Sequence, residues 1–168
     1  TDLHWVEAIR YAADMGADVI SIGLIITPSP AVMDALRYAL VKGRQGKGCV
    51  VCTALGNDGV YRRYGVDAAA AGEVLSVSGS TDYDRRSWFG DYGPSLNLVC
   101  PAGGGNPDLK VWSTDRMGTN GYNDSGNYYS SAGTSASCPL AAAIAALVIT
   151  LHPNWSGLEV RQVLEASC

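Results

Sequence analysis

One serine in this sequence has a setting in which its hydroxyl could act as a nucleophile. Ser135 follows Gly133 and Thr134, and an unbroken run of apolar, mostly small residues extends from it to about Thr150. The larger apolar side chains recur at helical spacing, which predicts a helix that is apolar all round and therefore buried on every side. Free N–H groups and the positive end of the dipole favour an anion in its first turn. A hydroxyl there can attack a carbonyl, and the developing oxyanion can accept a hydrogen bond from the serine's own N–H.

The same stretch has a second interpretation that involves no chemistry. A serine or threonine at the start of a buried helix is usually an N-cap, whose side-chain oxygen accepts a hydrogen bond from the first turn. Taken by itself, the stretch favours this cap over a nucleophile. Pro139 fits either interpretation, because we expect it to fall early enough in the helix to cost little.

Asn57 is a second residue whose position suits chemistry. It directly follows the apolar run at 49–55, a predicted strand, within Gly56-Asn57-Asp58-Gly59. Open parallel sheets bind their ligands just past the carboxyl ends of strands. The composition of this segment is equally typical of a plain turn. Both interpretations of Asn57 stay open at this point.

Hydrophobic periodicity outlines the scaffold that must position these residues. The predicted helices are one at 2–15 capped by Asp2, one capped by Ser29 with Pro30 at its first position, one after Gly133, and a last one at 157–166 capped by Ser156. The predicted strands are a buried strand at 17–23 and further strands at 49–55, 73–78, 96–100 and 111–114. Residues 118–131 are predicted to form a polar loop. Strands that alternate with helices indicate parallel pairing through right-handed crossovers. The sequence therefore predicts an α/β fold, a parallel sheet flanked by helices.

Composition argues against several classes of partner. The chain has 168 residues, which suits one domain over residues 1–168, and a formal net charge of −4. Nucleic acid is not an expected partner, because the sequence has no basic run interleaved with aromatic residues. A membrane is not expected either, because the longest apolar run, at 141–151, is too short to cross one. No signal-like segment stands at Thr1, so the chain resembles a piece of something longer.

The cysteines are odd in number, five in all, so at least one has no partner within the chain. Cys49 and Cys52 form a C-x-x-C, a spacing that suits metal or redox chemistry in other contexts. Here both lie in an apolar run that predicts a buried strand, where side chains three positions apart point to opposite faces. No second C-x-x-C and no nearby histidine complete a zinc site. We therefore expect buried structural thiols and no bound metal.

The stretch from Gly133 to Pro139 resembles the nucleophile motif of the subtilisin-like serine peptidases. That motif is Gly-Thr-Ser-x-[Ala/Ser]-x-Pro followed by an alanine-rich helix, and this chain has Gly-Thr-Ser-Ala-Ser-Cys-Pro. Other runs are similar to the family in the same order, namely GADVISIG, CVVCTALGNDG, SVSGSTDYDRRSWFGDYGPSLNLVCPAGG and LHPNWSGLEVRQVLEAS. The resemblance covers most of the chain and implies a subtilisin-like three-layer domain that is incomplete at its N-terminus.

The resemblance implies amide hydrolysis through an acyl-enzyme. Ser135 would be the nucleophile, and the Asn57 side-chain amide and the Ser135 N–H would hold the oxyanion. A peptide or protein substrate would bind as an added strand between two segments. The residues implied to contact it are Ile22, Gly23, Leu24 and Ile25 on one side, Thr53, Ala54, Leu55 and Gly56 on the other, and Gly133 and Thr134 beside the nucleophile.

The predicted cleft departs from the family pattern in size. Gly23-Leu24-Ile25-Ile26 stands where the family usually has Ser-Leu-Gly-Gly, and Leu55 stands where a small residue is typical. These bulkier walls predict a narrowed primary pocket that favours small side chains.

The acid and base of the family's triad have no clear counterpart in the sequence. The family order is Asp, His, Ser, with the Asp in Asp-Ser/Thr-Gly after a strand and the His in His-Gly-Thr at a helix start. Asp124-Ser125-Gly126 matches the first pattern, but no apolar strand precedes it, so we interpret it as a chance match. His152 lies 17 residues after Ser135, roughly 25 Å along a helix, which is too far for a base. His4 lacks the Gly-Thr, yet its place at a helix start leaves it open as a base.

The chain therefore resembles the C-terminal two-thirds of a catalytic domain. A truncated enzyme, one chain of a nicked two-chain enzyme and a degenerate relative all fit, and in the first two an N-terminal segment or chain would supply Asp and His. Because a serine without a base is a weak nucleophile, we expect little or no peptidase activity from this chain alone. We also expect an exposed sheet edge and apolar surface. The alternative is a non-catalytic module that binds a peptide or a partner chain.

The resemblance also bears on cofactors and compartment. It implies no cofactor for the chemistry. A structural calcium ion is common in the family, but no cluster of carboxylates in this sequence marks a site for one. The family is most often secreted, so we expect secretion.

Overall fold

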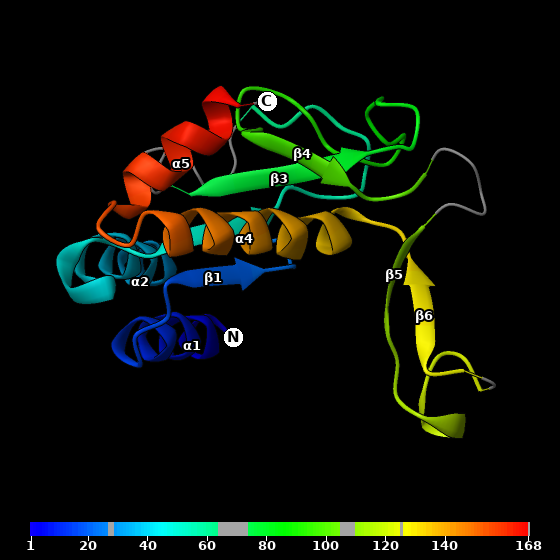
Figure 1. Ribbon diagram of the computed structural model, residues 1–168, viewed down its shortest axis with the longest axis horizontal. Helices are drawn as coiled ribbons and strands as arrows, with labels where there is room; N and C mark the ends of the chain where they lie inside the picture. Colours follow the sequence, from blue (N-terminus) through cyan, green and yellow to red (C-terminus); the bar gives the residue numbers. More distant parts are fainter. Residues whose placement is uncertain (27–28, 64–73, 105–109, 125, 168) are drawn as a thin grey trace.

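A four-stranded parallel sheet forms the centre of the computed structural model (Figure 1). The structure describes the whole chain except residues 27–28, 64–73, 105–109, 125 and 168. In spatial order the strands are β1 (Val19–Ile22), β2 (Val50–Ala54), β3 (Leu75–Ser80) and β4 (Leu98–Pro101). Because all four run parallel, their last residues meet at one end of the sheet, where α/β proteins place their sites. We call this the carboxyl end, and the end where the four strands begin is the amino end.

Helices cover both faces of the sheet, and the α/β fold predicted from the sequence is confirmed. α1 (Asp2–Asp14) and α2 (Pro30–Lys42) bury apolar side chains against one face. α4 (Thr134–Leu151) and α5 (Gly157–Ala166) bury theirs against the other. A short 3-10 turn, η1 (Arg44–Gly46), precedes β2 at the amino end.

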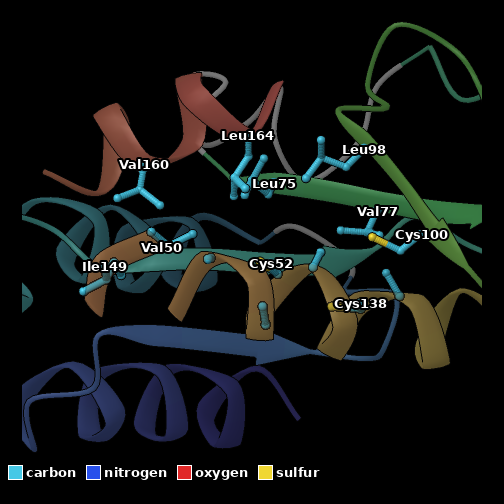
Figure 2. Close-up of a cluster of buried hydrophobic side chains, with 14 residues drawn as sticks. Val50, Cys52, Leu75, Val77, Leu98, Cys100, Cys138, Ile149, Val160 and Leu164 are labelled. Carbon is cyan, nitrogen blue, oxygen red and sulfur yellow. The ribbon is translucent and has the colours of Figure 1, made fainter. Parts of the chain in front are cut away.

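The strand β2 separates two cores, because its side chains alternate between the faces of the sheet. Cys49, just before β2, lies in the core under α1 and α2. Cys52 lies with Cys100 and Cys138 in the core under α4 and α5 (Figure 2). The prediction of buried thiols on opposite faces is confirmed for Cys49 and Cys52, whereas Cys168 lies outside the described residues. Burial raises the pKa of the Cys52 thiol, so this thiol stays protonated and unreactive.

Two helices begin at the caps that the sequence predicts. The Ser29 hydroxyl oxygen accepts a hydrogen bond from the Val32 N–H at 3.4 Å. Ser156 forms a capping box: its Oγ accepts from the Glu159 N–H at 3.2 Å, and Glu159 Oε2 accepts from the Ser156 N–H at 2.7 Å. α1 differs, because Asp2, the predicted cap, is already its first helical residue.

Residues 118–131, predicted as a loop, contain a short turn and a strand. The turn is η2 (Gly118–Asn120), and β6 (Tyr128–Ser131) pairs antiparallel with β5 (Val111–Thr114). The resulting hairpin extends away from the main sheet (Figure 1). Every residue of β5 and β6 is exposed or half-buried, so no alternation of apolar and polar residues marks the second strand in the sequence.

The helix α4 is buried on one side only, which corrects the prediction of a helix covered all round. It packs on the four strands and on α5, but Ile144, Leu147 and Leu151 are exposed on its outer face. Its length and mean hydropathy of 1.8 would suit a membrane span, yet its inner side chains form a core with the sheet, as in a core helix. The strand β1 is predicted to be buried, but it is an edge strand of the sheet, and Ser21 on it is exposed.

Candidate active site

The start of α4 brings Ser135 to the carboxyl end of the sheet. The Gly133 N–H donates to the Ala102 carbonyl at 3.1 Å, directly past β4, and this bond anchors the helix start. Gly133 has a φ of +138°, a conformation that glycine adopts without penalty. Its carbonyl accepts the first bond of the helix, from the Ala136 N–H at 3.0 Å. Ser135 is the second residue of α4 and is exposed.

Asn57 caps this helix from a different loop. Its Oδ1 accepts hydrogen bonds from the Thr134 N–H at 2.8 Å and from the Thr134 hydroxyl at 3.0 Å. The N-cap residue is Gly133, which has no side chain, so the interpretation of Ser135 as an N-cap is wrong. Asn57 does more than form a turn, because its side chain contacts a residue 77 positions away. Nothing local to either stretch signals this contact.

The cap fixes which way the Asn57 amide faces. Because Oδ1 accepts both bonds from Thr134, the N–H groups of Nδ2 are left to donate elsewhere. A Cβ built on Gly133 would lie 3.3 Å from Ser135 Oγ and 3.6 Å from Asn57 Nδ2, so both atoms border the same small space. Within the described residues, the Ser135 N–H has no hydrogen-bond acceptor. A hydroxyl and two free donors therefore lie together at the start of α4.

The end of β1 lies directly against Ser135. A Cβ on Gly23 would lie 3.3 Å from the Ser135 carbonyl oxygen, so the lack of a side chain lets the two backbones approach. Pro139 lies five residues into α4, past the first turn, and cannot donate to that same carbonyl. This corrects the prediction that the proline falls early enough in the helix to cost little. The Ser135 carbonyl loses a helical hydrogen bond there.

The two predicted substrate segments meet but differ in exposure. Leu24 and Ile25 are each more than half exposed. A Cβ on Gly56 would lie 3.3 Å from Ile25 Cδ1, so the segments touch at this point. The remaining apolar and hydroxyl side chains of the segments are buried, namely Ile22, Thr53, Ala54 and Leu55.

The two histidines lie on different helices. His4 is exposed in the first turn of α1. His152 follows the last turn of α4, and its ring stacks on Trp155 with the centroids 3.8 Å apart. The length of α4 therefore separates His152 from Ser135. Ser125, the middle residue of the Asp-Ser-Gly match, lies outside the described residues.

Carboxylate, histidine and cysteine side chains are the usual ligands of metal ions in proteins. Among the residues that the structure describes, no group of three or more of these side chains could hold a metal ion.

Known proteins match both this sequence and this arrangement of helices and strands. A family model described as the subtilase family matches residues 1–168. The chain belongs to this family. A relative of this chain is named a serine protease, and the resemblance of this chain's motifs to the family is confirmed.

This chain matches two curated subtilases over only part of their length. The chain is 38% identical over 146 residues to the "Calcium-dependent protease" of Trichormus variabilis, a match that covers 80% of this chain and 22% of that protein. It is 32% identical over 159 residues to the "Halolysin-like extracellular serine protease Nep" of Natrialba magadii, which covers 94% of this chain and 26% of that protein. The chain thus spans about a quarter of the length of these relatives.

A solved subtilase structure has the same fold. The crystal structure of a cold adapted subtilisin-like serine proteinase superposes with a TM-score of 0.78 at 22% identity. The match covers 99% of this chain and 54% of that chain. The subtilisin-like architecture predicted from the sequence is confirmed.

Proposed function

We propose that this chain provides the nucleophile and the oxyanion hole of a subtilisin-like serine endopeptidase. Ser135 Oγ attacks the carbonyl carbon of the scissile peptide bond while its proton passes to a base. The base then gives this proton to the leaving amine, and water hydrolyses the resulting acyl-enzyme. Asn57 Nδ2 and the Ser135 N–H donate to the oxyanion. The observation that carries the proposal is the pair of bonds from Thr134 to Asn57 Oδ1, which leaves Nδ2 as a donor beside the serine.

The substrate is proposed to bind as an extended peptide past the ends of β1 and β2. Gly23, Leu24 and Ile25 form one side of the path, and Gly56 and Leu55 the other. The exposed Leu24 and Ile25 support an apolar side to this path. We expect a preference for small residues at the cleavage site, because Ile25 and Leu55 are bulkier than the residues usual in the family at these positions; a strong preference for large aromatic residues in a peptide library would contradict this.

Ser135 needs a base, which we propose comes from an N-terminal segment or chain that also supplies the Asp. Without it, the serine hydroxyl is a weak nucleophile, so residues 1–168 alone are expected to hydrolyse peptides very slowly or not at all. The relatives support two further proposals, secretion and dependence on calcium, since one is named an extracellular protease and another a calcium-dependent protease.

The test is to label the intact protein, by which we mean this chain together with the proposed N-terminal segment or chain, with a fluorophosphonate probe. The adduct is then located by intact mass and peptide mapping. One adduct on Ser135, lost in Ser135→Ala, is the expected result. Residues 1–168 alone should label far more slowly, which would place the base elsewhere. Labelling that survives Ser135→Ala would refute the assignment of the nucleophile.

A second candidate function is a non-catalytic module that binds a peptide or a partner chain. It is favoured by the position of His152, at the far end of α4 from the serine. The same experiment separates the two functions. An intact protein that binds extended peptides but never forms an adduct on Ser135 would support the binding module.

A further inference from the structure

A buried carboxylate lies beside the loop that carries Asn57. Asp91 has no exposed surface, and a buried charge must be compensated by hydrogen bonds or an opposite charge. Its Oδ1 accepts from the Asp58 N–H and the Val60 N–H, both at 3.0 Å. Its Oδ2 accepts from Arg62 Nε at 2.7 Å. All these donors belong to the five residues that follow Asn57 in the chain.

The backbone of Asp91 holds the other side of Asn57. The Asp91 N–H donates to the Gly56 carbonyl at 3.0 Å. The Asp91 carbonyl in turn accepts from the buried Ser78 hydroxyl at 2.7 Å, which anchors it on β3. Asp91 therefore bonds to the peptide group before Asn57 and to the peptide group after it.

The fit between this carboxylate and the loop leaves no spare room. Gly56 has a φ of +137°, and a Cβ there would overlap Asp91 Oδ2. Further backbone bonds continue the pairing, from the Gly59 N–H to the Phe89 carbonyl at 2.7 Å and from the Tyr92 N–H to the Val60 carbonyl at 3.1 Å. The Asn57 loop is thus bound along its length to the segment around Asp91.

Asn57 itself has few bonds that could hold it in place. Its residue is exposed, and its side chain bonds to Thr134 alone among the described residues. An oxyanion donor must be held near its working position, because a small misplacement weakens transition-state stabilisation. The rigidity must then come from the peptide groups on either side.

We propose that Asp91, neutralised by Arg62, is the positioning residue that holds Asn57 in place as the oxyanion donor. This inference rests on the proposed function. Asp91 does not touch the substrate; it acts through Gly56 and Asp58. Its influence should therefore appear in kcat, where the oxyanion is stabilised, and it should vanish when the Asn57 amide is absent.

The test is a double-mutant cycle between Asp91→Asn and Asn57→Ala in the intact protein, with a peptide p-nitroanilide as substrate. The asparagine amide nitrogen cannot accept a hydrogen bond, so one group of donors loses its acceptor. Asp91→Asn alone should lower kcat about 10-fold and change KM less than about twofold. In the Asn57→Ala background it should change kcat less than about twofold. An equal loss in both backgrounds, or no loss in either, would overturn the inference.

Controls keep the outcomes separate. Asp18 forms an ion pair with Arg44 at the amino end of the sheet, with Arg44 Nε 2.6 Å from Asp18 Oδ1. Asp18→Asn removes the same charge from this pair and should leave kcat unchanged. If Asp91→Asn does not fold, Arg62→Met in the same cycle tests the claim, because it leaves the buried Asp91 carboxylate without the cation that neutralises it, which should displace the Asn57 loop. An Asn57→Ala variant with unchanged kcat would refute the proposed function itself. A large loss in Asn57→Ala with an additive effect of Asp91→Asn would refute only the positioning role.

Discussion

Two ion pairs lie at opposite ends of the sheet, and they bury opposite charges. At the carboxyl end the aspartate is buried: the Asp91 side chain is 0% exposed and that of Arg62 is 34% exposed. At the amino end the arginine is buried: the Arg44 side chain is 3% exposed and that of Asp18 is 60% exposed. The two Asp–Arg ion pairs thus differ in which partner is buried.

The difference follows from the backbone groups that each buried charge collects. Asp91 accepts from N–H groups of the loop after β2. Arg44 donates to the Gly48 carbonyl at 3.3 Å and the Trp155 carbonyl at 3.0 Å, and so joins the turn before β2 to the turn before α5. Both buried charges join segments that are distant in the sequence, but Asp91 binds N–H groups of the loop after β2, whereas Arg44 binds carbonyl groups of two turns at the amino end. Substitutions at matched positions should therefore have unequal effects.

The largest difference is expected between two glycines. Gly56→Ala should lower the free energy of unfolding by about 3 kcal/mol, because its Cβ overlaps Asp91 Oδ2 and its φ is +137°. Gly46→Ala, at the amino end, should cost about 1 kcal/mol, because its φ is +89° but no atom of the described residues lies within 4 Å of the added Cβ. Urea unfolding measures the free energy of unfolding of both variants. Equal losses would show that the close contact between Gly56 and Asp91 Oδ2 adds no constraint.

The same substitution in each ion pair gives the next contrast. Asp91→Asn should lower the free energy of unfolding by about 2 kcal/mol, since a buried donor loses its acceptor. Asp18→Asn should cost less than about 1 kcal/mol, because the aspartate is exposed and the amide oxygen can still accept from Arg44. Thermal unfolding of the two variants side by side checks this, and the reverse order would contradict the comparison.

A smaller effect is expected from the cap beside the amino end. Ser156→Ala removes the acceptor of the Glu159 N–H and should cost about 1 kcal/mol. The rate of Ser135 labelling should not change, because α5 starts at the other end of the sheet from the nucleophile. A change in labelling without a change in folding would show that the two ends are coupled.

The smallest effect concerns pH. Hydrogen bonds from the Ser156 N–H and hydroxyl lower the pKa of Glu159. A carboxyl with a lower pKa in the folded chain stabilises the fold above its unfolded value, about 4.3, and loses this contribution as the pH falls through the folded value. The stability of Glu159→Gln should therefore lie below that of the wild type above about pH 5 and converge with it in acid. A constant difference in the free energy of unfolding between Glu159→Gln and the wild type at every pH would refute this.

Local signals in the sequence predict local hydrogen bonds well. Ser29 before a proline and Ser156 three residues before Glu159 are both caps in the structure, since their partners lie within one turn. The period of 2 places Cys49 and Cys52 in different cores for the same reason. The family motifs extend this reach, because they mark Ser135 and the overall fold.

Features that depend on distant contacts or on exposure could not be predicted in this way. The bonds of Asp91 join residues about 30 positions apart and depend on how two loops align, which no periodicity encodes. Every residue of the strand β6 is exposed or half-buried, so the strand has no pattern of buried apolar residues. The apolar composition of α4 predicts a helix buried on every side, which is wrong for its outer face, because composition alone does not show whether another element covers that face.

The central claim is that Asn57 is placed to donate to an oxyanion, beyond capping α4. Asn57→Asp tests it most directly, because a carboxylate can still accept the two bonds from Thr134 but offers no N–H. We expect the unfolding midpoint to stay the same or rise, while kcat of the intact protein falls by about 10²- to 10³-fold or more. A variant that folds normally and keeps the wild-type kcat would show that Asn57 only caps the helix.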